Sequence, residues 1–551
     1  MKIADALALA VRQAAGGRAD VAERIYEEIL RFDPAQPDAL HLMGRLRLDQ
    51  DRPGEALELL EAAAAARADH GLTLLHLAHA REATGADGTA ALRGAVLVEP
   101  GDPVILSTWG GVRQKATAIA DAITFYRRAR RAAPLLPAAV DNLLFCMALA
   151  PGYDDARQWA VNRTWGAAAE RTWPPAPPLA RDRDPERRLR IGYVAPDLTE
   201  HRFLSQIEPV LARHDRDRFE IRWFVDARAP DRPGVMPRVA LLDQVHPIHG
   251  LDRERRAALI RGAGIDILVN LLGFLTEHRQ LFATRLAPVQ VAYPINFSTT
   301  GLATVDWRIS DPWVDPPGET ERFNTERLWR LESGFLCYSP PSTRFPVSAG
   351  PAAHDGRITF ASFNAAAKIT AEAVALWRRI LDDVPGARLL VKAPELSRPD
   401  ISGRLRALFV DAGHDMARVR FVGHLPTKEE HLATIAEADI ALDSFPFGGG
   451  FTAIDAMWMG VPVVALRGVS VAGRFAYSTL MRLDLPELVA RSPGQYRDKA
   501  VALARDPVRL AAHRQGLRDR LARSSLFDFE RHTRELEAAF REMWRRWAAT
   551  I

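Results

Sequence analysis

Apolar residues recur at helical spacing over the first third of the chain, and the alternation typical of strands is scarce up to about residue 170. A repeat of about 34 residues relates successive stretches of this region. In three repeats a small residue precedes a large one by four positions: Ala22 and Tyr26, Ala56 and Leu60, and Ala122 and Tyr126. A small residue lets two helices approach closely, and the large residue fills the groove between them. The pattern predicts a repeat domain of paired helices over residues 1–172, with a generic all-helical domain as the alternative.

Prolines and mixed charges over residues 173–188 mark a linker, after which the pattern changes. RLRIGYVAPD and FEIRWFVD are typical of buried strands, and FLSQIEPVLARH between them is typical of a helix. RRAALIRGAGIDILVNLLG continues as a helix followed by a strand. Alternating strands and helices predict a parallel sheet covered by helices over residues 189–340.

A second break over residues 341–356 precedes another series of the same kind. Five runs in it are typical of strands: RITFASFN, ARLLVKAP, RVRFVGHL, DIALDSFP and VPVVALRG. Helical patterns lie between them, so we expect a second Rossmann-like domain over residues 357–525. The closing stretch, residues 526–551, has the pattern of a helix, and we expect it to pack back on the first of the two domains.

The composition narrows the class of protein. With 551 residues the chain is too long for one hydrophobic core, and 48% apolar and 26% charged residues are ordinary for a globular protein. The net charge of +4 and the lack of a nucleic-acid-binding motif argue against a nucleic-acid partner. Two isolated cysteines, Cys146 and Cys337, fit a reducing compartment and argue against a structural zinc site. No run reaches the roughly 18 apolar residues of a membrane span, so we expect a cytoplasmic protein.

The loop DSFPFGGGFTAIDAMWMG, residues 443–460, carries the strongest chemical signal. Three glycines follow a strand, and two residues then begin a helix: Gly448, Gly449, Gly450, Phe451 and Thr452. Glycines let the backbone approach a ligand, and the unpaired N–H groups of a helix start attract a diphosphate. Asp455, in the first turn, would accept hydrogen bonds from a ribose or sugar hydroxyl. The alternative is a capping loop in which Asp455 favours the helix dipole.

Other strand-end loops offer further polar side chains, and ligands bind beyond the carboxyl ends of parallel strands. In the second domain they are Lys368, Lys428 and His431. A lysine beside a diphosphate would neutralise the charge that develops as a sugar leaves. In the first domain they are Asp197, His201, Asn270, His278, Arg279, Thr299 and Thr300. A strand-end histidine would orient an acceptor hydroxyl or assist proton removal, although most single histidines are structural. No GxGxxG follows the first strand and no GxxxxGK[ST] occurs, which argues against a hydride-transfer enzyme and a P-loop NTPase.

Taken together, these loops resemble those of the O-linked N-acetylglucosamine transferase family, glycosyltransferase family 41, in its bacterial form. LRIGYVAPDLTEH resembles the family's RIGYVSxDFxxH, and further motifs stand in the family's order: IDILVNLLG, APVQV, TTGLATVDWRISDP, FNxxxKI, PTKEEH, LDSFPF, DAMWMGVPVV and AGR. The match runs from roughly Asn142 to Trp547, and the repeats before it resemble tetratricopeptide repeats. The resemblance implies a GT-B fold, an α/β fold of two facing Rossmann-like domains, preceded by an all-α tetratricopeptide-repeat domain.

The resemblance also implies an inverting enzyme that needs no metal and no cofactor. Such an enzyme moves a sugar from a nucleotide-sugar donor, typically UDP-N-acetylglucosamine, to Ser or Thr of an acceptor protein. By matching positions, His201 and Lys368 would be catalytic, and Lys368 would bind the diphosphate. The donor-binding positions would be Lys428, His431, Gly449, Gly450, Phe451, Thr452, Asp455 and Arg474. The positions at the junction with the acceptor would be Asp197, Asn270, Thr299 and Thr300.

By the same resemblance, the repeat arm would hold the acceptor protein. Arms of many relatives present a ladder of asparagines along the inner groove. Here the matching positions are Leu42, Thr108 and Asn142, of which only the last conforms. We therefore expect this arm to grip a folded surface or a narrower set of acceptors. A homo-oligomer formed through the arm is a further expectation left open.

Several positions around the donor depart from the family pattern. The family's GHTT is GGFT at residues 449–452, its GYPGT loop is INFST at residues 295–299, and the Gln after the FN motif is Ala365. An Arg expected near the base is Thr434. The alternatives are a flagellin-specific transferase with another donor such as a nonulosonic acid, hexose transfer to Asn, a glycan or lipid-linked acceptor, and a catalytically degenerate repeat scaffold.

Overall fold

The computed structural model describes residues 2–174, 176–177, 182–196, 201–226, 243–271, 278–293, 297–339 and 345–550. The chain divides into two compact units, Met1–Leu143 and Leu144–Ile551. The first unit is helical, and the second contains two parallel sheets. Within the described part of the chain, no helix is both long enough and apolar enough to cross a membrane.

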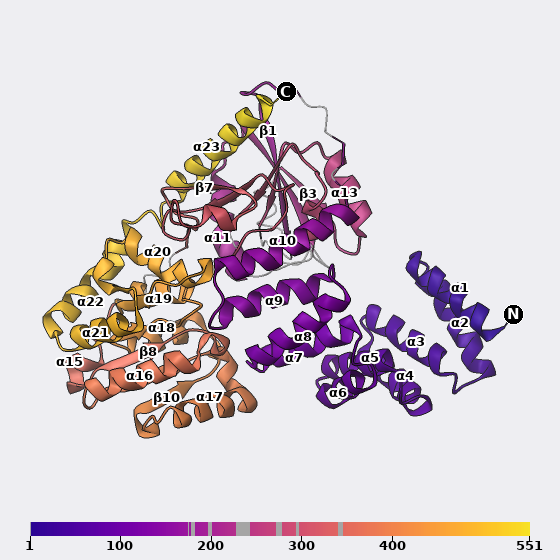
Figure 1. The fold of residues 1–551 in the computed structure, drawn as a ribbon, viewed down its shortest axis with the longest axis horizontal. Helices are drawn as coiled ribbons and strands as arrows, with labels where there is room; N and C mark the ends of the chain where they lie inside the picture. Colours follow the sequence, from indigo (N-terminus) through magenta and orange to yellow (C-terminus); the bar gives the residue numbers. More distant parts are fainter. Residues whose placement is uncertain are drawn as a thin grey trace. The chain divides into compact units, whose positions relative to one another are not determined.

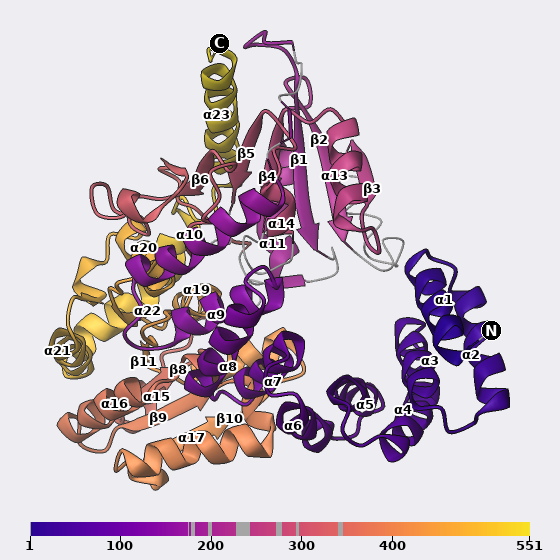
Figure 2. The same ribbon diagram turned by 45° about the vertical axis from the view of Figure 1, so that its right-hand side comes forward.

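Successive helices of the first unit lie side by side in pairs, as Figure 2 shows for α1 with α2 and for α3 with α4. The helices are α1 (Ile3–Ala15), α2 (Ala19–Phe32), α3 (Pro37–Asp49), α4 (Pro53–Ala66), α5 (Gly71–Ala83), α6 (Thr89–Val98), α7 (Pro103–Lys115) and α8 (Ile119–Ala132). The boundary between the two units falls inside the next helix, α9 (Pro137–Leu149), so Phe145 belongs to the second unit. A Cβ on Gly44 would lie 2.7 Å from Leu60 Cγ, and one on Gly110 would lie 2.8 Å from Tyr126 Cε1. Glycine therefore lets α3 approach α4, and α7 approach α8, which confirms the predicted repeat of paired helices.

Four histidine rings gather in the first unit, on α3 and on or next to α5. The His41 ring centroid lies 5.1 Å from that of His70 and 5.0 Å from that of His76. The His76 ring centroid lies 6.3 Å from that of His79. Burial disfavours the charged form, which lowers the pKa of His41 to about 4 and that of His76 to about 3. The packing of α3 against α5 thus uses neutral imidazole rings.

Acidification from pH 7 to pH 5 should therefore destabilise the first unit. Histidine has a pKa of about 6.5 in the unfolded chain, so the contribution of His41 and His76 is present above that pH and is lost as the pH falls toward their folded pKa values. We expect a loss of about 2 kcal/mol after solvent screening. Hydrogen exchange should show reduced protection of α3 and α5 at pH 5. The His76→Phe variant should lose less, and equal protection of the native arm at both pH values would contradict the account.

The first sheet of the second unit has the strand order β3-β2-β1-β4-β5-β6-β7. Its strands, all paired in parallel, are β1 (Leu189–Pro196), β2 (Phe219–Asp226), β3 (Gln244–Pro247), β4 (Ile267–Asn270), β5 (Val289–Ala292), β6 (Trp307–Ser310) and β7 (Arg327–Arg330). The helices around it are α10 (Asp155–Thr172), α11 (His201–Arg213), α13 (Arg253–Gly262), α14 (Arg279–Phe282) and α23 (Phe529–Ala548). Figure 2 shows α23 and α13 on opposite sides of this sheet.

The closing helix α23 lies along the first sheet (Figure 1). Its Leu536, Phe540 and Trp544 are buried in one apolar core with side chains of β1 and β2. A polar contact adds to this packing, because Glu537 Oε1 lies 2.9 Å from His214 Nδ1 at the end of α11. The C-terminal helix therefore completes the core of a domain that begins more than 300 residues earlier in the chain.

Helix α10 belongs to the second unit, although the sequence pattern predicts it as the end of the repeat arm. The reason is its polar and aromatic contact with the first sheet's domain. Asn162 Oδ1 accepts a hydrogen bond of 2.7 Å from Arg279 Nη1, and the Arg279 guanidinium lies 3.7 Å from the centroid of the Trp165 ring. A Cβ on Gly166 would lie 1.9 Å from Gly301 O, so glycine is required where α10 contacts the loop between β5 and β6.

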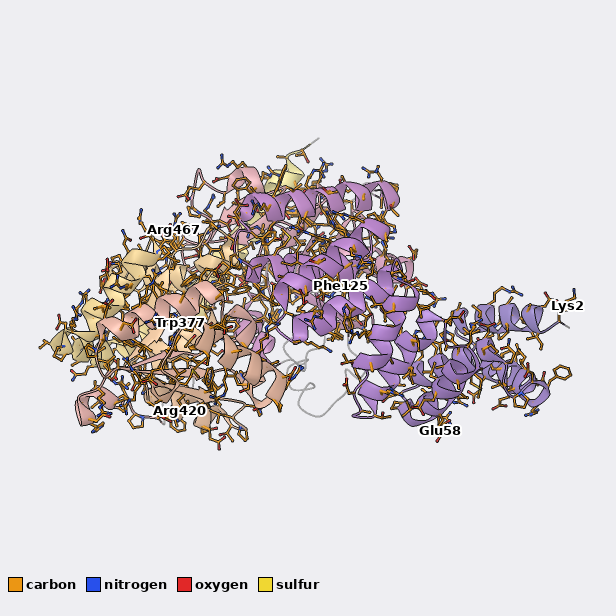
Figure 3. All side chains as sticks on the ribbon, turned by 60° about the horizontal axis from the view of Figure 1, so that its bottom comes forward. Lys2, Glu58, Phe125, Trp377, Arg420 and Arg467 are labelled. Carbon is orange, nitrogen blue, oxygen red and sulfur yellow. The ribbon has the colours of Figure 1, made fainter. Side chains whose placement is uncertain are left out.

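The second sheet has the strand order β10-β9-β8-β11-β12-β13, again with every pairing parallel. Its strands are β8 (Thr359–Ser362), β9 (Arg388–Lys392), β10 (Val419–Val422), β11 (Ile440–Leu442), β12 (Val463–Leu466) and β13 (Val489–Ala490). Its helices are α15 (Pro351–Asp355), α16 (Ala371–Asp383), α17 (Pro399–Asp411), α18 (Lys428–Ala436), α19 (Phe451–Trp458), α20 (Phe475–Arg482), α21 (Pro493–Ala504) and α22 (Pro507–Ala522). Trp377 on α16, labelled in Figure 3, is fully buried in its core. The two sheets are the predicted pair of Rossmann-like domains.

Candidate active site

The strand order of the second sheet reverses between β8 and β11, its two central strands. β8 is followed along the chain by β9 on one side, whereas β11 is followed by β12 on the other. Ligands of open parallel sheets bind at such a reversal, beyond the carboxyl ends of the strands. Two predicted loops lie there: residues 363–370 after β8, and residues 443–450 after β11.

These two loops meet through Lys368, which ends a short 3-10 turn after β8. Lys368 Nζ donates a hydrogen bond of 2.9 Å to Gly448 O and lies 3.9 Å from the centroid of the Phe447 ring. Desolvation lowers the pKa of Lys368 to about 8, although the carboxylates of Asp443 and Glu395 favour its charged form. The structure thus brings the predicted lysine and the predicted glycine turn together.

Two of the three glycines are needed by the protein itself. The Gly449 N–H donates a hydrogen bond of 2.7 Å to Asp443 Oδ1. A Cβ on Gly448 would lie 2.9 Å from Asp443 Oδ2, and one on Gly449 would lie 2.9 Å from Asp443 Oδ1. Gly450 differs, because a Cβ there would meet no atom within 4 Å. Open space therefore adjoins only Gly450, which immediately precedes α19.

Gly449→Ala should lower the stability of the second unit more than Gly450→Ala does. In the first variant the new Cβ would press on Asp443 Oδ1 and on Thr452 Oγ1, at 2.9 and 3.0 Å. Overpacking of this kind costs about 1–3 kcal/mol. The matched variant at Gly450 adds the same methyl group to open space. Thermal unfolding of the two variants measures the difference, and equal melting temperatures would contradict the geometry.

Residues from α18 and α19 form a charged cluster next to the turn. Lys428 Nζ lies 2.5 Å from Asp455 Oδ2, and His431 Nε2 lies 3.5 Å from the same oxygen. Tyr338 OH donates a hydrogen bond of 2.6 Å to Asp455 Oδ1. Burial raises the pKa of Asp455, but His431, Lys428 and Tyr338 outweigh it and hold the pKa below its usual value. Lys428, His431 and Asp455 were predicted; Tyr338 was not, and its position just before a proline-rich break gives no signal of this contact.

The helix start after the glycine turn carries Phe451 and Thr452, the two remaining predicted residues of this loop. Thr452 Oγ1 donates a hydrogen bond of 3.2 Å to Asn364 Oδ1, and Asn364 Nδ2 donates one of 3.1 Å to Asp443 Oδ1. Phe451 instead stacks on Tyr338, with ring centroids 5.4 Å apart. A small pocket lies between Asn364, Asp443 and Thr452.

Arg474, predicted to bind the donor, contacts other groups of the protein. Its Nη2 lies 2.7 Å from Asp155 Oδ2 on α10, and its Nε donates a hydrogen bond of 2.5 Å to Val314 O in the first domain. The guanidinium is buried. Arg474 therefore joins α10, the first domain and the second domain, and these contacts occupy its Nε and Nη2 groups.

Two of the predicted junction residues of the first domain, Thr299 and Thr300, bind a glutamate of the same domain. Thr299 Oγ1 donates a hydrogen bond of 2.5 Å to Glu326 Oε2, and the Thr300 N–H donates one of 2.7 Å to Glu326 Oε1. Asn270 ends β4 and is buried. His201 begins α11, but its side chain lies outside the described residues, as does all of Asp197.

Two further predicted residues, His278 and Arg279, also contact other side chains of the protein. His278 Nε2 lies 3.0 Å from Asp226 Oδ2 at the end of β2. This contact, which outweighs burial, holds the pKa of Asp226 well below its usual value. Arg279 binds Asn162 of α10. Both therefore shape the first domain at the carboxyl edge of its sheet.

An aromatic cluster that sequence reasoning missed lies next to Lys368. The Phe447 ring centroid lies 5.2 Å from that of Phe297, 6.2 Å from that of Phe145 and 6.1 Å from that of Phe475. Phe297 comes from the first domain, and Phe447 and Phe475 come from the second. The two Rossmann-like domains therefore touch beside the ammonium group. Phe297 belongs to the INFST loop, one of the departures from the expected pattern.

A larger cavity, of about 650 Å³, lies at the opposite edge of the second sheet. It is lined by residues at the amino ends of three strands, among them Thr359, Arg388 and Val419. This is the edge where parallel sheets do not place their ligands. We therefore take the Lys368 site, and not this cavity, as the candidate active site. Among the described residues no group of three or more His, Cys, Asp or Glu is arranged to hold a metal ion.

Comparison with known proteins places these features in a family. The family model "Glycosyl transferase family 41" matches residues 177–338 and 351–536. The probable UDP-N-acetylglucosamine–peptide N-acetylglucosaminyltransferase SPINDLY of Petunia hybrida is 34% identical over 413 residues, which are 74% of this chain and 44% of that protein. The UDP-N-acetylglucosamine–peptide N-acetylglucosaminyltransferase of Caenorhabditis elegans is 34% identical over 194 residues, 35% of this chain and 16% of that protein.

A solved structure resembles the whole chain. A mutant O-GlcNAc transferase of Thermobaculum terrenum matches with a TM-score of 0.73 and 31% identity, and the match covers 100% of this chain and 98% of that one. The chain spans less than half the length of the curated plant relatives it matches. The matched family region contains both sheets and the loops that carry Lys368 and the glycine turn.

Proposed function

Because the chain belongs to glycosyltransferase family 41, we propose that it transfers a sugar from a nucleoside diphosphate donor to a protein. UDP-N-acetylglucosamine is the first donor to consider, because the named activity of the curated relatives uses it. The hydroxyl groups of Ser or Thr are the proposed acceptors. Flagellin with a nonulosonic acid donor is the second candidate, and the departures at residues 449–452 and 295–299 are the observation that favours it.

The observation that carries the proposal is the contact of Lys368 with the turn before α19. Lys368 Nζ lies 2.9 Å from Gly448 O, two residues before the open space at Gly450. The first N–H groups of a helix lack partners within the helix and carry partial positive charge. An ammonium group and a helix start that flank one space suit a diphosphate leaving group.

In the proposed reaction, the acceptor hydroxyl attacks the anomeric carbon on the face opposite the diphosphate. The C–O bond to the diphosphate breaks as the new bond forms, and the configuration inverts. Lys368 and the first N–H groups of α19 stabilise the negative charge that develops on the leaving diphosphate, so these groups take the role that a metal ion would otherwise fill. His201, at the start of α11, is the proposed group that assists the acceptor hydroxyl.

The remaining predicted residues would bind the nucleoside. Lys428 is half exposed in its ion pair with the buried Asp455, so it can turn toward a ligand while the carboxylate stays fixed. His431 would lie beside the base. The repeat arm would bind the acceptor protein, as stacked helical repeats present extended binding surfaces.

Two measurements test this proposal. The first is calorimetric titration with UDP, UDP-N-acetylglucosamine and CMP; we expect micromolar to millimolar binding of UDP by the native chain and at least tenfold weaker binding by Gly450→Ala, whose fold stays intact. The second is mass spectrometry of proteins incubated with UDP-N-acetylglucosamine, which should show added N-acetylhexosamine on Ser or Thr. Binding of CMP instead of UDP would favour the flagellin candidate. A chain that binds none of these nucleotides would be the degenerate scaffold.

A further inference from the structure

The carboxylate of Asp443 is the unexplained feature of the active site. It is almost fully buried at the carboxyl end of β11, directly beneath the turn expected to hold a diphosphate. A negative charge at this place opposes the binding of another anion. Burial also raises the pKa of Asp443, to about 6. A buried carboxylate both repels a bound diphosphate and loses its hydration, so its presence here calls for a role that offsets these two costs in free energy.

The contacts of Asp443 show what it organises. Its Oδ1 accepts hydrogen bonds from the Gly449 N–H, at 2.7 Å, and from Asn364 Nδ2, at 3.1 Å. Its backbone oxygen accepts a hydrogen bond of 2.8 Å from Tyr496 OH. Both carboxylate oxygens lie against the turn so closely that a Cβ on Gly448 or Gly449 would come within 2.9 Å of them. The contacts with this side chain therefore fix the conformation of the glycine turn.

The same carboxylate also acts on the charge of Lys368. Lys368 Nζ binds Gly448 O, the carbonyl next to the residue that Asp443 holds. The charged groups that favour the ammonium form of Lys368 are Asp443 first and Glu395 second, against the desolvation that lowers its pKa. Among the described groups that face Asp443, Lys368 is the cation, and Tyr496 is a buried phenol whose pKa lies well above its usual value.

We propose that Asp443 is the positioning residue of the donor site: it shapes the glycine turn and keeps Lys368 charged for the diphosphate. This inference rests on the proposed function and adds one residue to it. In this proposal Asp443 acts through Lys368 and through the Gly449 N–H, and not by contact with the sugar or the phosphates. It also supplies the reason for two of the three consecutive glycines.

The test is the pH dependence of UDP binding, measured by calorimetry between pH 7 and pH 9.5. In the native chain, affinity should fall above pH 8 as Lys368 loses its proton. Asp443→Asn keeps an oxygen that accepts from the Gly449 N–H but removes the charge. The fall should then begin about one pH unit lower, which is the low end of the effect of one nearby opposite charge.

A matched control is Asp439→Asn, at the other end of β11. Asp439 is also buried, and its carboxylate accepts hydrogen bonds from the Thr359 and Ala352 N–H groups. It lies at the edge of the sheet away from Lys368, so the pH at which affinity falls should stay unchanged in this variant. In Lys368→Arg the alkaline fall itself should disappear, because a guanidinium does not lose its proton in this range.

The outcomes separate this inference from the proposed function. No UDP binding by the native chain would remove the function and the inference together. Native binding with an alkaline fall that Asp443→Asn leaves at the same pH would overturn the role of Asp443 alone. If Asp443→Asn does not fold, Asp443→Ser removes the same charge with a smaller side chain, and the same shift is expected of it. A uniform loss of affinity at every pH would indicate a purely structural role and would also overturn the proposal.

Discussion

Replacing Lys368 with alanine should reduce kcat for sugar transfer by about 10²–10³-fold, the effect of removing one donor that stabilises charge in a transition state. The lysine contacts the glycine turn through a hydrogen bond of 2.9 Å from Nζ to Gly448 O. In the proposed reaction its charge acts on the leaving diphosphate as the bond breaks, so kcat should fall more than the affinity for the donor. Steady-state kinetics with UDP-N-acetylglucosamine and an identified acceptor protein measures both quantities.

The control for this prediction is Lys428→Ala, which removes a lysine from the same site but from the nucleoside side. Its ion pair with Asp455 places it away from the leaving group in the proposed reaction, so the loss should appear mainly in KM. Circular dichroism should show both variants folded. A Lys368→Ala variant with native kcat would contradict the role of the lysine in leaving-group stabilisation.

Removing the carboxylate of Asp155 should reduce the free energy of unfolding of the second unit by about 3–5 kcal/mol, the cost of leaving a buried charge without its partner. Asp155 Oδ2 lies 2.7 Å from Arg474 Nη2, and Asp155 Oδ1 accepts a hydrogen bond of 3.1 Å from the Val471 N–H. Asp155→Ala would leave the buried Arg474 guanidinium without this counter-charge. Urea unfolding, followed by tryptophan fluorescence, measures the change.

Two comparisons make this prediction specific. The double variant Asp155→Leu with Arg474→Met removes both charges and should recover much of the lost stability. Arg467→Ala removes a more exposed ion pair, which joins the second domain to Glu319 of the first domain, with Oε2 at 2.8 Å (Arg467 is labelled in Figure 3). Such a pair contributes at most about 1 kcal/mol. Equal losses from Asp155→Ala and Arg467→Ala would contradict the assignment of Asp155–Arg474 as the buried ion pair that joins α10 to the second domain.

The central strands could be predicted from the sequence because they are buried on both faces. IDILVNLLG contains β4, and DIALDSFP contains β11; every residue of both strands is buried, as is typical of short apolar runs in a parallel sheet. The edge strands β3 and β7 were not singled out. Their sequences, QVHP and RLWR, are short, polar and partly exposed, so they lack an apolar pattern.

The core of the site could also be predicted, because it depends on a local rule. Loops at the carboxyl ends of neighbouring parallel strands must meet, and this rule brings Lys368 to the glycine turn from 80 residues away. The purpose of the glycines was predicted only in part. Gly448 and Gly449 have no side chain because Asp443 occupies that space, and the sequence does not show which neighbour a glycine avoids.

Contacts between distant elements could not be predicted. Arg474 was predicted to bind the donor from its matching position in the family resemblance, and it pairs with Asp155, 319 residues away. Thr299 and Thr300 likewise bind Glu326 in the folded first domain. Nothing in a single sequence indicates which buried carboxylate meets which buried cation or hydroxyl. These pairings depend on how helices and strands far apart in the sequence pack together, so no local sequence pattern predicts them.

The most direct test of the account is a crystal structure of this chain with UDP bound. We expect the β-phosphate between Lys368 Nζ and the backbone N–H groups at the start of α19, close to Gly450. The nucleoside should lie on the side of Lys428 and His431. UDP bound at another place on the chain, or a β-phosphate out of hydrogen-bond reach of both Lys368 and the α19 start, would contradict it.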